Sequence, residues 1–107
     1  MAELEPYRVV ISARAGADLR AIFDYIAQDS PRNAAKVIDG LLSAMDALVL
    51  FPRRYPVVAS RRRPRHETRL MPARPYLVYY RIIESDRVVL MAEVRHGARR
   101  RPRNPGS

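Results

Sequence analysis

The alternation of hydrophobic and polar residues is clearest in the last third of the chain. Over residues 76–83 the side chains alternate with a period of two, and the run is apolar on both faces for most of its length. A polar break at residues 84–86 precedes a second alternating run over residues 88–95. Both runs are rich in the β-branched and aromatic residues that strands favour. We therefore predict a β-hairpin whose first strand is central in a sheet and covered on at least one side.

Two amphipathic helices are predicted upstream of this hairpin. Ser12 is a suitable N-cap for a helix over residues 13–28, and Ser30 followed by Pro31 starts a second helix that Pro52 stops. The short connection makes the helices antiparallel, so their joint apolar face needs a sheet to cover it. The residues expected in this core follow helical spacing and are Leu19, Ile22, Phe23, Ile26, Ile38, Leu41, Leu42, Met45 and Leu48.

The remaining strands are shorter. Residues 7–11 form a first strand, and residues 67–71 form a strand that the prolines at 72 and 75 place at an edge of the sheet. The predicted fold is α+β with the order β-α-α-β-β-β, a helical hairpin packed on a small, mainly antiparallel sheet. The first strand could join either edge or pair with the last. Tyr79 and Tyr80 point to opposite faces, so at most one can face the helices, and Met45, Met71 and Met91 are expected to fill the core.

Composition narrows the class of protein. The 107 residues suit a single domain over residues 1–107, with a flexible tail from about residue 101 that is too polar and proline-rich to pack. Arginines and prolines interrupt every apolar run, the first residues are acidic, and there is no cysteine. We therefore expect a cytoplasmic protein without membrane association. Without a glycine-rich phosphate loop, a metal-ligand cluster or a Ser/His/Asp set, we expect no metal and no cofactor.

The net charge of the chain says more about its binding partner than about its fold. The net charge is +9 with a pI near 11.0, and Lys36 is the only lysine. The planar guanidinium of arginine binds phosphates and carboxylates alike, so the charge suits a nucleic acid or an acidic protein. The densest charge lies at Arg61, Arg62, Arg63 and Arg65, with Arg53, Arg54, Arg69 and Arg74 nearby. This run is either a contact surface or a solvated loop that keeps a small domain soluble.

The order of motifs resembles the RelE/ParE superfamily of bacterial type II toxins, and within it the ParE branch. The resemblance covers the chain from residue 7 to residue 100. Each motif alone is weak and the ordered set is specific. The motifs are Asp18-Leu19…Ile22…Tyr25-Ile26, Ser30-Pro31…Ala34-Ala35, Tyr79-Tyr80-Arg81 and Arg95-His96.

This resemblance implies a toxin encoded beside a ParD-like antitoxin. ParE-type toxins poison DNA gyrase and are not enzymes, whereas RelE-type toxins of similar fold cleave mRNA on the ribosome. The toxin–antitoxin pair would repress its own operon through the antitoxin, so this chain would meet operator DNA only indirectly. A strongly basic domain also suits an acidic antitoxin tail. A third reading is a basic RNA- or DNA-binding module without toxicity.

The nuclease alternative designates a small set of residues. His96 could act as acid or base, with Arg81, Arg95 and Arg99 on the phosphate. Alternatively, His96 is a strand-end residue that bonds the backbone or touches the antitoxin, and His66 is a weaker candidate. RelE-type enzymes present lysines, a glutamate or a tyrosine near the C-terminal strand, yet this chain has no tyrosine after Tyr80. Glu67 and Glu93 could serve as bases only if they face the same cleft as His96.

We therefore favour a ParE-like gyrase inhibitor without catalytic residues over the nuclease. The residues expected to bind partners are Arg61, Arg62, Arg63, Arg65, Arg69, Arg74, Arg95, His96, Arg99 and Arg100.

Overall fold

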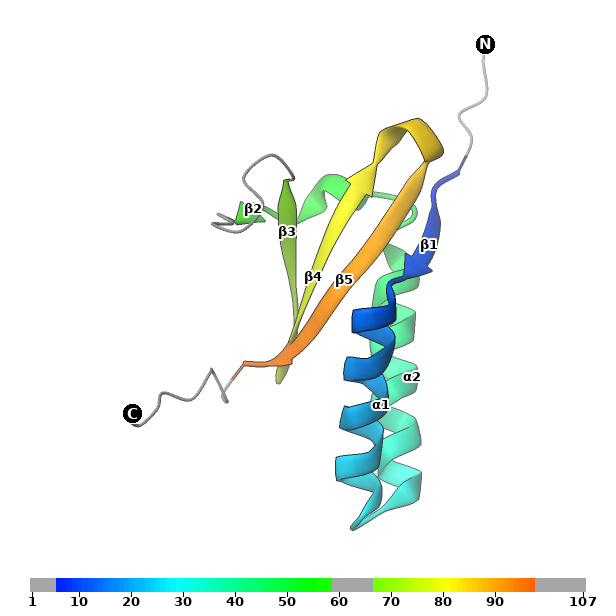
Figure 1. Ribbon diagram of the computed structural model, residues 1–107, viewed down its shortest axis with the longest axis vertical. Helices are drawn as coiled ribbons and strands as arrows, with labels where there is room; N and C mark the ends of the chain where they lie inside the picture. The colour runs from blue at the N-terminus through cyan, green and yellow to red at the C-terminus, as the bar shows by residue number, and fades with distance from the viewer. Residues whose placement is uncertain (1–5, 59–66, 98–107) are drawn as a thin grey trace.

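The computed structural model describes residues 6–58 and 67–97 and has the predicted α+β architecture, with two helices packed against one sheet (Figure 1). The elements in chain order are β1 (Arg8–Ile11), α1 (Ala13–Ala27), α2 (Pro31–Ala47), the 3-10 helix η1 (Pro52–Arg54), β2 (Val57–Val58), β3 (Thr68–Ala73), β4 (Tyr76–Ile83), the 3-10 helix η2 (Glu84–Asp86) and β5 (Val88–His96). No helix in the described part of the chain is long and apolar enough to cross a membrane.

The sheet has the strand order β1-β5-β4-β3-β2, in which β1 runs parallel to β5 and every other neighbouring pair is antiparallel. The central position of β4 confirms the prediction made from its apolar faces. The first strand pairs with the last one, which was one of the possibilities left open. β2 was not predicted, because two residues are too few to establish a period of two.

The prediction of an edge strand holds for one half of β3. β2 covers only Thr68 and Arg69, so the half of β3 that contains Pro72 has no outer neighbour among the described strands. Proline has no N–H to donate to such a neighbour, so Pro72 costs no ladder hydrogen bond there.

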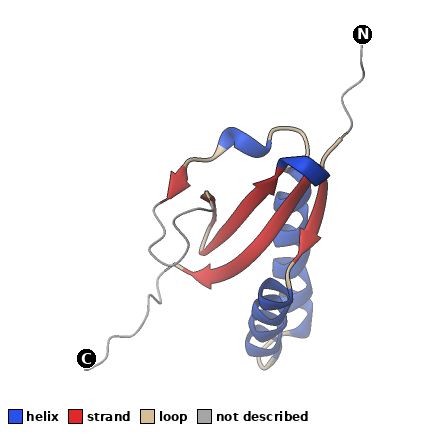
Figure 2. Ribbon diagram, turned by 45° about the horizontal axis from the view of Figure 1, so that its top comes forward, coloured by secondary structure: helices blue, strands red, loops and turns tan. Residues whose placement is uncertain are grey.

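The helices begin where their caps were predicted. The backbone N–H of Ala15 donates to Ser12 Oγ at 3.0 Å, and that of Asn33 donates to Ser30 Oγ at 3.0 Å. α2 ends at Ala47, before Pro52, and the residues between them form a turn. Both helices lie side by side and extend beyond one end of the sheet (Figures 1 and 2).

The core lies between the helices and one face of the sheet, and it includes Met45, Met71 and Met91 as predicted. Ile26 was expected in the core but is only partly buried and does not belong to the core cluster. Two further expected core residues are wrong, because Phe23 is 36% exposed and Leu42 is 38% exposed. Each follows a residue that turns inward, and one step along a helix rotates a side chain by about 100°. Ile22 and Leu41 therefore contact the core while their neighbours lie at its margin.

A β-bulge in β5 shapes the contact between the sheet and α1. Tyr79 pairs with Glu93 and Tyr80 pairs with Met91, so Ala92 is an extra residue. β1 ends before this point, which leaves the outer edge of β5 without a strand partner. Ser12 Oγ donates to the carbonyl of Ala92 at 3.1 Å, and Asp18 Oδ2 accepts from the N–H of Val94 at 2.9 Å. Side chains at the start of α1 thus form hydrogen bonds with the backbone groups of β5 that lie beyond the end of β1.

Candidate functional site

The structure describes the designated residues Arg69, Arg74, Arg81, Arg95 and His96 and the two candidate bases Glu67 and Glu93. The side chain of Glu67 is 75% exposed, and its Oε1 lies 3.9 Å from Arg69 Nη2. The others lie outside the described residues and remain predictions. These are Arg61, Arg62, Arg63, Arg65, His66, Arg99 and Arg100.

His96 lies on the face of the sheet that carries the helices. It pairs with Tyr76 across the β4–β5 ladder, and the two rings meet edge-on with their centroids 5.3 Å apart. Directly paired residues of antiparallel strands share one face, and Tyr76 belongs to the core cluster. The imidazole therefore packs beside the core at the end of β5.

Arg81 and Arg95 lie on the opposite, uncovered face. Arg95 stacks over the ring of Tyr79 at 5.0 Å, and its Nε donates to Glu93 Oε2 at 2.7 Å. This hydrogen bond raises the pKa of the Arg95 guanidinium. Arg95 pairs with Leu77, so Arg81 is four residues further along β4, or about 13 Å at the usual rise of a strand.

The designated nuclease residues are consequently divided between two faces. Glu93 lies with Arg95, and its Oε2 is also 3.6 Å from Arg14 Nη2. Its carboxylate therefore does not share a face with His96. Among the designated residues that the structure describes, His96 therefore does not share a face with Glu93, Arg81 or Arg95.

Arg69 has an internal contact that the sequence analysis missed. It pairs with Tyr80 on the helix-bearing face, and its side chain is only 15% exposed. Its Nη1 donates to the carbonyl of Tyr55 at 2.7 Å and more weakly to that of Arg53 at 3.4 Å. Arg69 thus holds the segment after η1 against the sheet, while Arg74 is exposed in the β3–β4 turn.

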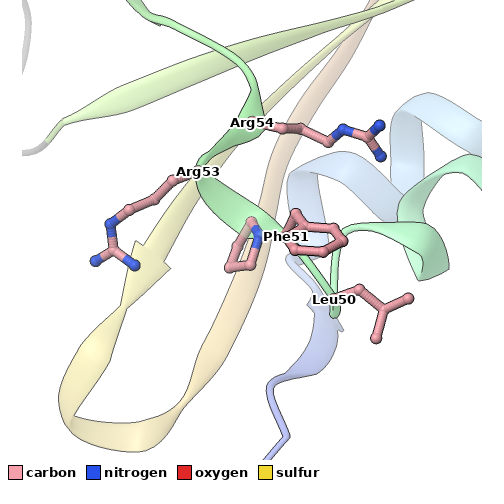
Figure 3. A pocket seen from close by; sticks show the side chains of 5 residues that line it. Leu50, Phe51, Arg53 and Arg54 are labelled. Carbon is pink, nitrogen blue, oxygen red and sulfur yellow. The ribbon is translucent and has the colours of Figure 1, made fainter.

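A second feature was also missed, at the point where the chain leaves α2. Residues Leu50, Phe51, Pro52, Arg53 and Arg54, which we call the α2–η1 corner, line an open pocket of about 520 Å³ (Figure 3). Leu50 is 72% exposed and Phe51 is 65% exposed, whereas Pro52 is buried. The signal that could have revealed this corner is an apolar pair at a helix end, followed directly by Pro-Arg-Arg.

Polar contacts from the sheet fix the corner. The hydroxyl of Tyr80, which is fully buried, donates to the carbonyl oxygen of Pro52 at 2.6 Å. Burial raises the pKa of this hydroxyl, so it remains a proton donor over the ordinary pH range. Together with the bond from Arg69 to Tyr55, this bond anchors the first carbonyl of η1 and the carbonyl that follows its last residue.

Arg53 belongs to a cluster of polar side chains from three segments, namely Tyr7 before β1, Arg53 in η1, and Glu84 and Arg87 in the turn of η2. Tyr7 donates to Glu84 Oε2 at 2.6 Å, and Arg53 Nη2 donates to the same oxygen at 2.7 Å. Arg87 lies over the Tyr7 ring at 4.3 Å and donates to its hydroxyl at 3.3 Å. The bonds from Tyr7 and Arg53 lower the pKa of Glu84, and those to Tyr7 and Glu84 raise the pKa of Arg53. The cluster carries two positive charges against one negative.

The described residues contain no group of three or more His, Cys, Asp or Glu side chains that could hold a metal ion.

Comparisons with known proteins agree with this fold. A family model described as the ParE toxin of the type II toxin–antitoxin system parDE matches residues 9–101. Toxin RelE2 of Caulobacter vibrioides is 36% identical over 92 residues, which cover 86% of this chain and 97% of that protein.

Two solved structures are similar in three dimensions. The chromosomal ParDE toxin–antitoxin system from P. aeruginosa aligns with a TM-score of 0.65 and 18% identity, covering 84% of this chain and 95% of that one. The toxin–antitoxin complex RelBE2 from Mycobacterium tuberculosis aligns with a TM-score of 0.58 and 26% identity, covering 86% and 99% respectively. Sequence and fold thus lead to the same group of proteins.

Proposed function

The chain belongs to the ParE toxin family of type II toxin–antitoxin systems, and on that premise we propose that it inhibits DNA gyrase. In this account the toxin acts by binding and not by catalysis. It works in the cytoplasm, and a ParD-like antitoxin neutralises it.

The observation that carries this proposal is the separation of His96 from Arg81 and Arg95. General acid–base catalysis needs a proton carrier within hydrogen-bond reach of the reacting group, with the charge-stabilising groups around the same point. His96 lies beside Tyr76 on the helix-bearing face, whereas both arginines lie on the other face. Arginine alone is a poor proton carrier because it stays charged. This arrangement supports a binding protein better than a nuclease.

The charge of the chain supports an antitoxin as the partner. The two solved structures named above are described as a toxin–antitoxin system and a toxin–antitoxin complex. A net charge of +9 favours association with an acidic protein through long-range attraction. Operator DNA would then be reached through the antitoxin, without direct contact by this chain.

The alternative is a ribosome-dependent mRNA endonuclease of the RelE type. The observation that favours it is the 36% identity to a protein named Toxin RelE2. In that case His96 would transfer protons, and Arg81, Arg95 and Arg99 would contact the phosphate.

Replacement of His96 separates the two functions. We expect His96→Ala to arrest growth as effectively as the wild-type toxin when induced without antitoxin, with cellular mRNA intact by primer extension. Thermal melts of the purified wild type and variant verify that the fold survives. Loss of growth arrest in folded His96→Ala, together with mRNA cleavage by the wild type, would favour the endonuclease.

A further inference from the structure

The α2–η1 corner exposes an unusual amount of apolar surface. Leu50 and Phe51 are adjacent and 72% and 65% exposed, and of the other large hydrophobic residues that the structure describes only Tyr25, at 65%, is exposed to a similar degree. Single exposed hydrophobic residues are common on protein surfaces, but two that share a pocket form a contiguous patch. Removing this patch from water would favour the binding of an apolar side chain.

Arg54 adds a positive charge on the same side of the corner. In Figure 3 the side chains of Leu50, Phe51 and Arg54 extend to one side of η1, and that of Arg53 extends to the other. Arg53 is already bonded to Glu84. Within the described residues Arg54 forms no ion pair, and its guanidinium lies over the Tyr55 ring at 5.6 Å. A carboxylate could therefore bind Arg54 without displacing an internal acidic partner.

The corner is also prepared for binding before a partner arrives. Tyr80 holds the Pro52 carbonyl, Arg69 holds the Tyr55 carbonyl, and the Glu84 cluster holds Arg53. A surface that is already ordered loses less conformational entropy on binding than a mobile loop does. The exposed side chains thus stand on a fixed backbone.

We propose that the α2–η1 corner docks an acidic segment of the antitoxin. A bulky apolar residue of that segment enters the pocket between Leu50 and Phe51, and a neighbouring carboxylate pairs with Arg54. The inference rests on the proposed function, because it takes the antitoxin as the partner. To the proposed function the inference adds the toxin surface that binds the antitoxin and the chemical character of the antitoxin segment that binds there.

An acidic peptide fits this surface better than nucleic acid or small anions do. Nucleic-acid affinity comes mainly from several phosphate contacts along a basic track, and the corner offers one arginine that forms no ion pair within the described residues, beside two apolar groups. Arginine is enriched in the binding hot spots of protein–protein interfaces, which cluster in pockets that exclude water. The net charge of +9 would attract an acidic segment to the surface.

The test is isothermal titration of the full-length toxin with the full-length antitoxin encoded beside it. We expect Phe51→Ala and Arg54→Glu each to weaken binding at least about tenfold, the scale of a hot-spot loss. Leu50→Ala is a second apolar variant, chosen because the side chain contributes little to the fold. Raising the salt concentration should reduce the difference between Arg54→Glu and wild type and leave that of Phe51→Ala unchanged.

Matched controls lie on the helices away from the corner. Tyr25→Ala removes an aromatic side chain that is also 65% exposed, and Arg32→Glu reverses a charge that is exposed at the start of α2. Both should bind the antitoxin within about twofold of wild type, as expected for surface changes remote from the contact. Circular dichroism melts confirm that all variants are folded.

Failure of the proposal differs from failure of the proposed function. If the wild-type toxin does not bind the antitoxin, the proposed function is contradicted together with its partner. If the wild type binds and the folded Phe51→Ala, Leu50→Ala and Arg54→Glu variants bind equally well, the corner is not the docking site. Unchanged antitoxin binding with loss of gyrase inhibition would assign the corner to the target and overturn the proposal.

Discussion

The hydroxyl of Tyr80 reaches from the centre of the sheet to the carbonyl oxygen of Pro52, a distance of 2.6 Å. Tyr80 lies on β4 and is fully buried, and Pro52 begins η1. The bond therefore connects the central strand of the sheet to the corner that exposes Leu50 and Phe51.

Tyr80→Phe should lower the free energy of unfolding by about 1–3 kcal/mol, because it leaves a buried carbonyl without its donor. Tyr79→Phe is the matched control, since its ring lies on the uncovered face and retains the stacking of Arg95. We expect its effect to stay within about 0.5 kcal/mol. Urea denaturation of both variants measures the difference, and equal stabilities would contradict the assigned role of the bond.

Because of the Tyr80 hydroxyl, we expect the folded state to lose stability at alkaline pH. Burial raises the pKa of Tyr80 above its ordinary value of 10.0. The folded state then holds this proton more tightly than the unfolded state, so the stabilisation is complete below pH 10.0 and is lost as the pH rises through the folded pKa. Denaturant unfolding across this range should show a shallower decline for Tyr80→Phe than for wild type. If the free energy of unfolding declined equally in wild type and Tyr80→Phe, groups other than Tyr80 would be responsible for the loss of stability.

Asp18 should stabilise the junction between α1 and β5. Its Oδ2 accepts a hydrogen bond from the Val94 N–H. Val94 lies beyond the last residue of β5 that pairs with β1. Asp18→Ala should cost about 1–3 kcal/mol, because a part-buried donor loses its acceptor. Asp18→Asn keeps an acceptor and should recover part of this loss, and the exposed Asp24→Ala serves as control. Thermal melts would contradict the assignment if Asp18→Ala and Asp24→Ala were equivalent.

Glu84 should contribute to stability in a pH-dependent way. Hydrogen bonds from Tyr7 and Arg53 lower its pKa below the ordinary 4.5. Its stabilisation is therefore present above pH 4.5 and is lost as the pH falls through the lower, folded pKa. The effect should be small and sensitive to salt, because the group is exposed. Glu84→Gln should flatten the decline of melting temperature in this acidic range, and an unchanged slope would rule the cluster out as its source.

Much of the fold follows from periodicity and capping. The bounds of β4 match residues 76–83, and Ser12 and Ser30 cap the helices as predicted. The pairing of β1 with β5 could not be derived, because a strand's own period does not specify its neighbour. Phe23 and Leu42 lie next to inward-facing residues, so an apolar pattern alone does not place them at the margin.

The candidate site was predictable only in part. From the sequence alone Arg69 is interpreted as a surface arginine in a basic segment. Its pairing with Tyr80 places its side chain on the helix-bearing face of the sheet. Leu50 and Phe51 read as the end of an apolar helix, and only the early end of α2 brings them into solvent. Both errors have one cause. Side-chain direction depends on where an element ends and on which residue lies opposite, and local composition specifies neither.

The most direct test of gyrase inhibition is the supercoiling of relaxed plasmid by purified gyrase from the source organism, with the toxin titrated in and the antitoxin added back. The account predicts that the toxin abolishes supercoiling or causes cleaved plasmid to accumulate, that His96→Ala does so equally, and that the antitoxin restores activity. Unchanged supercoiling at saturating toxin, with mRNA cleavage during translation, would contradict the account and establish the endonuclease.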